Sequence, residues 1–314
     1  MTWCETTNPM AEDNEQISVS IPKTQNFPSS LAIVSVISLA LLNVNHTQPT
    51  VPILGFHGLV DMKNTTLALK TNEMQYSQQE IEKLLNYLII NDYWFLSTQD
   101  LYDFFLTKSQ AIPSAHRQQK PIMISFDDGY KSVHTKLLPI LLKLEKKYKK
   151  KVKVVLFINP GNLAKSGVNS KTHLGCQELR EGLEKGFYDI QSHGLKHRDL
   201  TQLSRRELLR ELVQSRTILR NCTKGLDPKQ QVASHFAYPY GATNKQVASY
   251  VSRYYLTGYL YNDQLLNHTC VNNYYQIPRL MVNRQKSPQE LIQMAEKQHP
   301  SHKQQGKEKP NDQC

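Results

Sequence analysis

From residue 50 onward, short apolar runs alternate with longer segments of helical periodicity, and this alternation constrains the fold more than any other feature. Several runs are almost continuously apolar, which is typical of strands buried on both faces of a parallel sheet. The helical segments, such as 77–91, 203–221 and 287–298, place apolar residues on one face. The pattern therefore predicts an α/β fold, a β/α barrel that is open or closed, with its active site at the carboxyl ends of the strands. The seven predicted strands are residues 51–58, 121–128, 152–160, 187–194, 234–241, 254–261 and 276–283.

The basic charge of the chain is concentrated in one place. The 314 residues carry a net charge of +11, and much of the excess lies in the lysine run of residues 143–153. Such a run suits an acidic partner, but it is also typical of a solvated helix end, where cations are stabilising. No recognition motif accompanies the run, so we favour the solvated helix and expect no nucleic-acid partner.

The two ends of the chain differ in composition from the middle. Residues 1–28 are polar, and residues 29–44 are apolar apart from their serines and Asn43. This apolar stretch is shorter than the roughly 20 residues of a membrane-spanning helix and matches a signal-peptide core in length. A buried core helix is the alternative. We predict a signal or anchor segment over 29–45, a secreted or membrane-anchored protein, and a single extracytoplasmic catalytic domain over 46–298. The polar tail 299–314 is predicted to be disordered.

Five cysteines are scattered along the chain without a CxxC pair. This spacing argues against a zinc ribbon and against a small disulfide-dense fold. A single bridge, Cys222 to Cys270 for instance, is compatible with the sequence, which does not establish a pairing.

Polar residues capable of catalysis follow several predicted strands directly. His57 ends the first run, Asp127 and Asp128 end the second, and His193 and His197 follow the fourth. The carboxyl ends of strands in a β/α barrel meet at one opening. These side chains are therefore expected to lie close together.

The adjacent aspartates 127 and 128 are followed at once by Gly129. On a regular strand their side chains would point to opposite faces, whereas a glycine-led turn lets both face one cavity. One can then bind a metal while its neighbour acts as a base, with the cation keeping both ionised. An ordinary solvated Asp-Gly turn is the alternative reading of these three residues alone.

The HxxxH spacing of His193 and His197 brings both imidazoles to one metal if the segment turns helically. Two histidines and one carboxylate form a tripod for a catalytic zinc. Two unrelated surface histidines are the alternative, and they become less attractive once the neighbouring aspartates are considered.

Three short motifs resemble those of the family 4 carbohydrate esterases, the polysaccharide deacetylase (NodB-homology) group. They are "SFDDG" at 125–129, "SHGLKH" at 192–197 and "FAYPYG" at 236–241, and the resemblance extends from about residue 51 to 298. It implies a distorted seven-stranded β/α barrel and metal-dependent removal of acetyl groups from N-acetylated sugars.

The resemblance also implies roles for individual residues. Asp128, His193 and His197 match the ligands of Zn²⁺ or another divalent transition metal. Asp127 matches the catalytic base, and the backbone N–H of Tyr240 matches the donor to the oxyanion.

The chain departs from the common family pattern in two places. Phe236-Ala237 stands where many members have an arginine, and the late Leu-x-His motif is missing. Deacetylases of poly-β-1,6-N-acetylglucosamine, a biofilm exopolysaccharide, resemble the chain at both places. By that resemblance His57 is the general acid, and Arg279 of Ile277-Pro278-Arg279 braces Asp127.

The same resemblance predicts the substrate and the groove. We expect a poly-β-1,6-N-acetylglucosamine-like polymer, with peptidoglycan, chitin or another exopolysaccharide as alternatives. Tyr130, Tyr238, Pro239 and Tyr240 are predicted to border the groove, since aromatic faces bind sugars. A non-catalytic glycan-binding module is the alternative of a different class. The sequence leaves protein partners open.

Overall fold

The computed structural model describes residues 50–63, 72–168 and 170–296. The predictions for residues 1–28, 29–45 and 299–314 lie outside this part of the chain. Within it, none of the helices combines the length and the apolar character that crossing a membrane requires.

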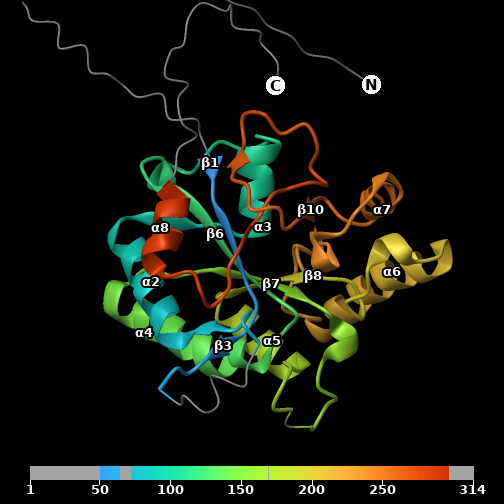
Figure 1. Cartoon of the computed structure of the whole chain (residues 1–314), viewed down its shortest axis with the longest axis horizontal. Coiled ribbons are helices and arrows are strands. Elements are labelled where there is room, and N and C mark those ends of the chain that lie inside the picture. Colours follow the sequence, from blue (N-terminus) through green and yellow to red (C-terminus); the bar gives the residue numbers. More distant parts are fainter. Residues whose placement is uncertain (1–49, 64–71, 169, 297–314) are drawn as a thin grey trace, which may run out of the picture. The chain divides into compact units, whose positions relative to one another are not determined.

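Seven parallel strands form one curled sheet with the order β10-β9-β8-β7-β6-β2-β12. An isolated parallel bridge between Tyr259 and Ile277 links β10 to the segment before β12, so the sheet bends into a half-barrel (Figure 1). All seven predicted strands are confirmed, although most are shorter than the apolar runs. They are β2 (Ile53–Phe56), β6 (Lys120–Asp127), β7 (Val154–Ile158), β8 (Tyr188–Ser192), β9 (Phe236–Ala237), β10 (Gly258–Tyr259) and β12 (Leu280–Met281).

Additional short strands lie outside that order. β5 (Tyr93–Phe95), which the sequence pattern did not reveal, pairs in parallel with the start of β6. β1 (Thr50–Val51) pairs with β11 (Leu266–Asn267), and β3 (Leu59–Val60) pairs with β4 (Tyr76–Ser77). The first predicted strand is divided at Pro52, which has no N–H to donate to a ladder.

The three predicted helices form, each with ends within two residues of its apolar pattern. Serine side chains start them; Ser204, for example, makes a reciprocal capping box with Glu207 at the start of α6. Figure 1 shows α2, α4 and α8 gathered at the left of the view and α6 and α7 at the right. The helices are α2 (Gln78–Ile90), α3 (Thr98–Asp100, continued by a π-helical turn over Leu101–Leu106), α4 (Leu138–Tyr148), α5 (Cys176–Glu184), α6 (Arg205–Cys222), α7 (Lys245–Val251) and α8 (Pro288–Glu296).

The two faces of the sheet are packed differently. The outer face packs against the helices, and the inner face forms a smaller apolar cluster that includes Met123, Phe157 and Tyr259. Alternation along β6 therefore points Ser125 and Asp127 into the barrel on the same face as Met123. The interior of the barrel is therefore apolar around Met123, Phe157 and Tyr259, and polar at the carboxyl end of β6.

The lysine run begins within α4 and continues past its end. Lys143 pairs with Glu82 at 2.5 Å, Lys150 with Asp92 at 2.6 Å, and Lys151 with Glu145 at 3.2 Å. These exposed pairs belong to a solvated helix end, which is the interpretation favoured from the sequence.

Cys176 and Cys222 form a disulfide between the start of α5 and the end of α6. The Cys222–Cys270 bridge considered from the sequence is therefore wrong. The pairing follows from the contact between these two helices, which spacing along the chain does not reveal.

Candidate active site

The two adjacent aspartates face one cavity because the backbone turns between them. β6 ends at Asp127, and the next two residues, Asp128 and Gly129, have φ of 71° and 73°. Such left-handed geometry is costly for a non-glycine residue and is common at functional sites. The turn predicted from Gly129 thus begins one residue earlier.

Asp127 is fully buried and is held by a buried arginine. The Arg279 guanidinium donates to both carboxylate oxygens of Asp127, at 2.8 and 2.9 Å, and to Ser125 Oγ at 3.2 Å. Burial opposes ionisation of Asp127, but the charge of Arg279, joined at low pH by that of protonated His193, outweighs it and lowers the pKa to about 2. The side chain of Arg279 is thus directed at Asp127, as the resemblance led us to expect.

Three side chains converge in an arrangement suited to a metal ion. One ligand atom each from Asp128, His193 and His197 lies within 4.8 Å of the others. Asp128 Oδ1 is 3.3 Å from Nε2 of His197 and 3.7 Å from Nε2 of His193. This oxygen is buried without a hydrogen-bond partner in the described residues. A buried acceptor left unpaired beside two imidazoles fits a cation between them.

The protonation states also suit a metal. His193 Nδ1 donates to the Ala237 carbonyl at 2.8 Å, a bond that leaves Nε2 free to bind a cation. Burial lowers the pKa of His193 to about 3 and lowers that of His197, so both are neutral near pH 7. Burial raises the pKa of Asp128 to about 6.

The loop that carries the two histidines is not helical, so the helical turn considered from the HxxxH spacing does not form. Gly194 and His197 have φ of 76° and 55°, so bends rather than a helical turn bring the imidazoles together. Two residues that the sequence did not single out hold this loop. Glu211 accepts hydrogen bonds from the N–H groups of residues 195 and 196 at 2.7 and 2.9 Å, and the Asn159 amide donates to the His193 carbonyl. A signal existed for Glu211, because a carboxylate on the buried stripe of α6 needs partners.

The Pro-Tyr-Gly turn borders the candidate metal site formed by Asp128, His193 and His197. Tyr240 has φ of 59°, is 68% exposed, and its ring centroid lies 4.5 Å from that of His197. The hydrogen bonds of the turn are donated by Gly241 and Ala242.

Two residues predicted to contact substrate are buried instead. Tyr238 is 0% exposed, and its hydroxyl donates to the Tyr275 carbonyl at 3.1 Å. Alternation along β9 directs Tyr238 toward the helices, and Pro239 is also buried. Tyr130 is half-buried and stacks on His173 at 5.6 Å. Tyr240 is thus the one strongly exposed aromatic side chain among the predicted groove residues.

His57 is an electrostatic neighbour of Asp127 and Asp128. It follows β2 directly, is half-buried, and helps to lower the pKa of both aspartates. Its ring stacks on Tyr261, with centroids 5.8 Å apart and planes inclined by 17°. The site therefore combines an ionised carboxylate, three side chains suited to one metal ion, a further imidazole and an exposed aromatic ring.

Residues 114–259 match the polysaccharide deacetylase family. YxkH of Bacillus subtilis, named as a polysaccharide deacetylase, is 26% identical over 188 residues, which are 60% of this chain and 58% of YxkH. The chain thus spans less than two thirds of that relative.

Solved structures of polysaccharide deacetylases share the fold. BC0361 of Bacillus cereus superposes with a TM-score of 0.64 at 19% identity, covering 79% of this chain and 69% of BC0361. The deacetylase PplD of Streptococcus pyogenes, solved with acetate, gives 0.63 at 22% identity, covering 79% of this chain and 99% of PplD.

Proposed function

We propose, on the premise that residues 114–259 carry a polysaccharide deacetylase domain, that this protein is a metal-dependent N-deacetylase. Its substrate is a polymer of N-acetylglucosamine outside the cell, and poly-β-1,6-N-acetylglucosamine or a close relative fits best. One observation carries the proposal. The ionised carboxylate of Asp127 is held by a buried arginine, and its Oδ2 lies 3.7 Å from Nε2 of His193, one of the three candidate metal ligands.

The residues present fit a divalent transition metal, with zinc the first choice. Asp128, His193 and His197 would hold it, and the ion would supply Lewis-acid activation of water and of the acetyl carbonyl. Asp127 remains ionised near neutral pH and is placed to accept the proton of the attacking water. Because Arg279 uses one lone pair on each oxygen, further lone pairs remain for that proton.

The remaining residues complete the reaction. The N–H of Tyr240 would stabilise the oxyanion, a contribution of about 3 kcal/mol for a single donor. His57, whose charge acts on both aspartates, would protonate the departing sugar amine. The exposed ring of Tyr240 provides a face for a sugar unit at the entrance.

Location and substrate rest on sequence features alone. Residues 29–45 support export, as a cleaved leader or as an anchor, with the catalytic domain outside the cytoplasm. His57 and the Pro-Arg segment at 278–279 support the β-1,6-linked polymer. Acetate in the PplD structure shows that a protein of this fold binds the expected product, which favours deacetylation over a non-catalytic glycan-binding module.

The test is the appearance of free amine on β-1,6-linked N-acetylglucosamine oligomers, using the full-length protein with zinc. Asp127→Asn is the matched variant, since it preserves shape and removes the base. Amine formation that depends on Asp127 supports the proposal. Activity on chitin or peptidoglycan fragments alone would replace the substrate and keep the chemistry. Glycan binding that needs no metal, with no acetate released from any polymer, would favour the binding module.

A further inference from the structure

Tyr261 contacts the base and acid sides of the site, although neither the motifs nor the family match includes it. It lies two residues beyond β10, on the interior face shared with Tyr259. The Arg279 guanidinium lies 3.9 Å from the centroid of its ring, and the same ring stacks on His57. One aromatic side chain therefore contacts both the partner of the proposed base and the proposed acid.

Two glycines pack so closely against Tyr261 that neither position has room for a side chain. A Cβ added to Gly55 would lie 2.4 Å from a ring carbon of Tyr261 and 2.5 Å from its phenol oxygen. Gly55 precedes His57 by two residues on β2, so the ring lies directly on the strand that leads to His57. A Cβ on Gly241 would lie 2.9 Å from the Tyr261 nitrogen, so the Pro-Tyr-Gly turn packs on the same residue.

Stacking holds both neighbours, and Arg279 is held in addition by hydrogen bonds to Asp127 and Ser125 and from its Nε–H to the Leu260 carbonyl at 3.0 Å. The Arg279 guanidinium lies between Tyr261 and Phe157, the latter at 4.9 Å, while it binds Asp127. A desolvated cation–π contact contributes about 2 kcal/mol. In the described residues, His57 Nδ1 is buried without a hydrogen-bond partner. Ring packing rather than a hydrogen bond to this nitrogen therefore sets the plane of the imidazole.

We propose that Tyr261 is a positioning residue whose ring aligns the Arg279–Asp127 pair and the His57 imidazole, and that Gly55 is the residue that makes room for it. This inference rests on the proposed deacetylase function. We assign the effect to the ring, because the contacts with Arg279 and His57 are both made by the ring, whereas the phenol oxygen lies beside the Asp127 carboxylate.

The test compares Tyr261→Phe, which keeps the ring, with Tyr261→Leu, which removes it. If the full cation–π contact of about 2 kcal/mol is lost from the transition state, kcat falls roughly 30-fold. We expect that fall in Tyr261→Leu with KM changed by less than about threefold, and near-normal kcat in Tyr261→Phe. Equal loss in both variants would assign the effect to the hydroxyl and overturn the proposal, as would full activity in Tyr261→Leu.

Gly55→Ala provides an independent perturbation, because it displaces the ring without altering it. We expect kcat to fall as in Tyr261→Leu, and the double variant to add little, since both changes act on one contact. Additive losses would contradict a shared cause. Tyr76→Leu is the control: it removes a fully buried ring from the outer side of the sheet, packed on Phe56. It should lower stability and leave kcat unchanged.

A readout without activity separates this inference from the proposed function. The Arg279 Nε–H signal, followed by NMR in the metal-free protein, should persist in Tyr261→Phe and broaden or vanish in Tyr261→Leu. An unchanged signal in Tyr261→Leu overturns the positioning role whatever the reaction is. Absence of acetate release by the wild type from every glycan overturns the proposed function instead.

Discussion

Two aspartates inside the barrel, at opposite ends of the sheet, are held in opposite ways. Asp127, at the carboxyl end of β6, faces the Arg279 guanidinium, which holds its pKa at about 2 against the cost of burial. Asp189, near the start of β8, accepts hydrogen bonds from the Thr98 N–H at 2.6 Å and hydroxyl at 2.7 Å, and from the Gln191 amide at 2.5 Å. Burial raises the pKa of Asp189 despite these bonds.

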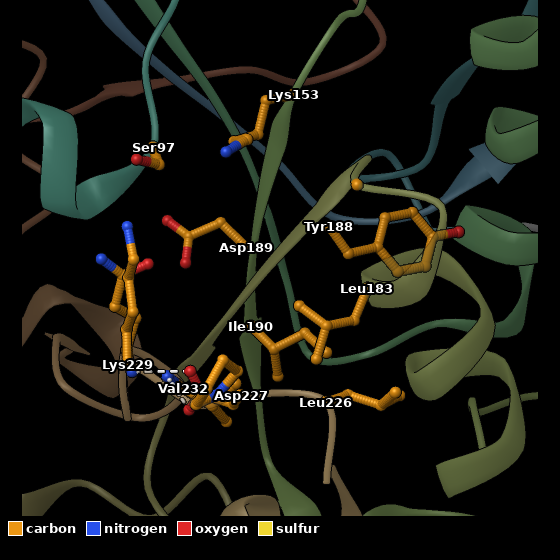
Figure 2. A pocket seen from close by; sticks show the side chains of 13 residues that line it. Ser97, Lys153, Leu183, Tyr188, Asp189, Ile190, Leu226, Asp227, Lys229 and Val232 are labelled. Carbon is orange, nitrogen blue, oxygen red and sulfur yellow. Dashed lines mark hydrogen bonds between the residues drawn. The ribbon is translucent and has the colours of Figure 1, made fainter.

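The surroundings of Asp189 differ accordingly. It lines a pocket of about 210 Å³, and Figure 2 shows its carboxylate on the side of Ser97 and Lys153. None of the residues lining this pocket is a histidine. Asp128, His193 and His197, the candidate metal ligands, lie at the other end of the sheet, where β6 and β8 end. The hydrogen bonds to Asp189 come from neutral donors, and the nearby charge of Lys153 does not offset its burial. At Asp127 a buried guanidinium bound to both oxygens does offset burial and keeps the carboxylate ionised.

The strongest way to break this comparison is Asp127→Asn. A positioned base contributes about 10²–10⁴-fold, so we expect a fall of about 1,000-fold in kcat for acetate release. The matched change at the other end, Asp189→Asn, should leave kcat within about twofold, because Asp189 lies away from the proposed chemistry. Comparable losses in both variants would contradict the division between the two ends.

The second test removes the cation. Arg279→Met leaves the Asp127 carboxylate buried and unpaired, which costs about 3–5 kcal/mol of stability. The pKa of Asp127 should rise, because the favourable charge is lost while burial remains, and the acid limb of kcat/KM should move to higher pH.

Urea unfolding and a pH–rate profile check both expectations. In the wild type, the depressed pKa contributes stability above pH 4 that is lost as pH falls toward about 2. The stability of Arg279→Met should not fall in this way between pH 4 and about 2. The double variant with Asp127→Asn should be more stable than Arg279→Met; a less stable double variant would count against a charge-pair origin.

A smaller effect is expected from Asp189→Asn on stability. The amide nitrogen cannot accept a hydrogen bond, so at least one donor among the Thr98 groups and the Gln191 amide loses its acceptor. An unpaired buried donor costs about 1–3 kcal/mol. Urea unfolding measures the change, and a loss as large as that of Arg279→Met would refute the contrast between neutral and charged partners.

The smallest effect concerns pH and the metal. Asp128 has a pKa of about 6, whereas His193 and His197 are already neutral near pH 7. Below pH 6 zinc must displace the Asp128 proton, so its apparent affinity should fall about tenfold per unit of pH, and it should be nearly constant above pH 7. Calorimetric zinc titrations at several pH values measure this. If the apparent zinc affinity continues to rise tenfold per unit of pH up to pH 8, a ligand other than Asp128 titrates.

Much of the fold was readable because strands and helices have different periods. The seven apolar runs became seven of the eight strands of the sheet. The polar residues after them lie at one end, because the strands are parallel and their carboxyl ends meet at one edge. The resemblance of "SFDDG" and "SHGLKH" placed Asp128, His193 and His197 together, and the structure brings them together.

What local patterns missed involves contacts between distant residues. The bends after His193, the burial of Tyr238 and the Cys176–Cys222 bridge each depend on which neighbour packs alongside. Tyr261 carried no signal in the sequence, because its importance lies in what its ring touches.

The sequence by itself therefore determined the elements, their order and the chemistry at the strand ends. Only the tertiary structure decided the electrostatics of the site. Asp127 and Arg279 are 152 residues apart and meet because β2 pairs with both β6 and β12. A pKa depends on charge and solvent within a few ångströms, and that neighbourhood exists only once the sheet has curled.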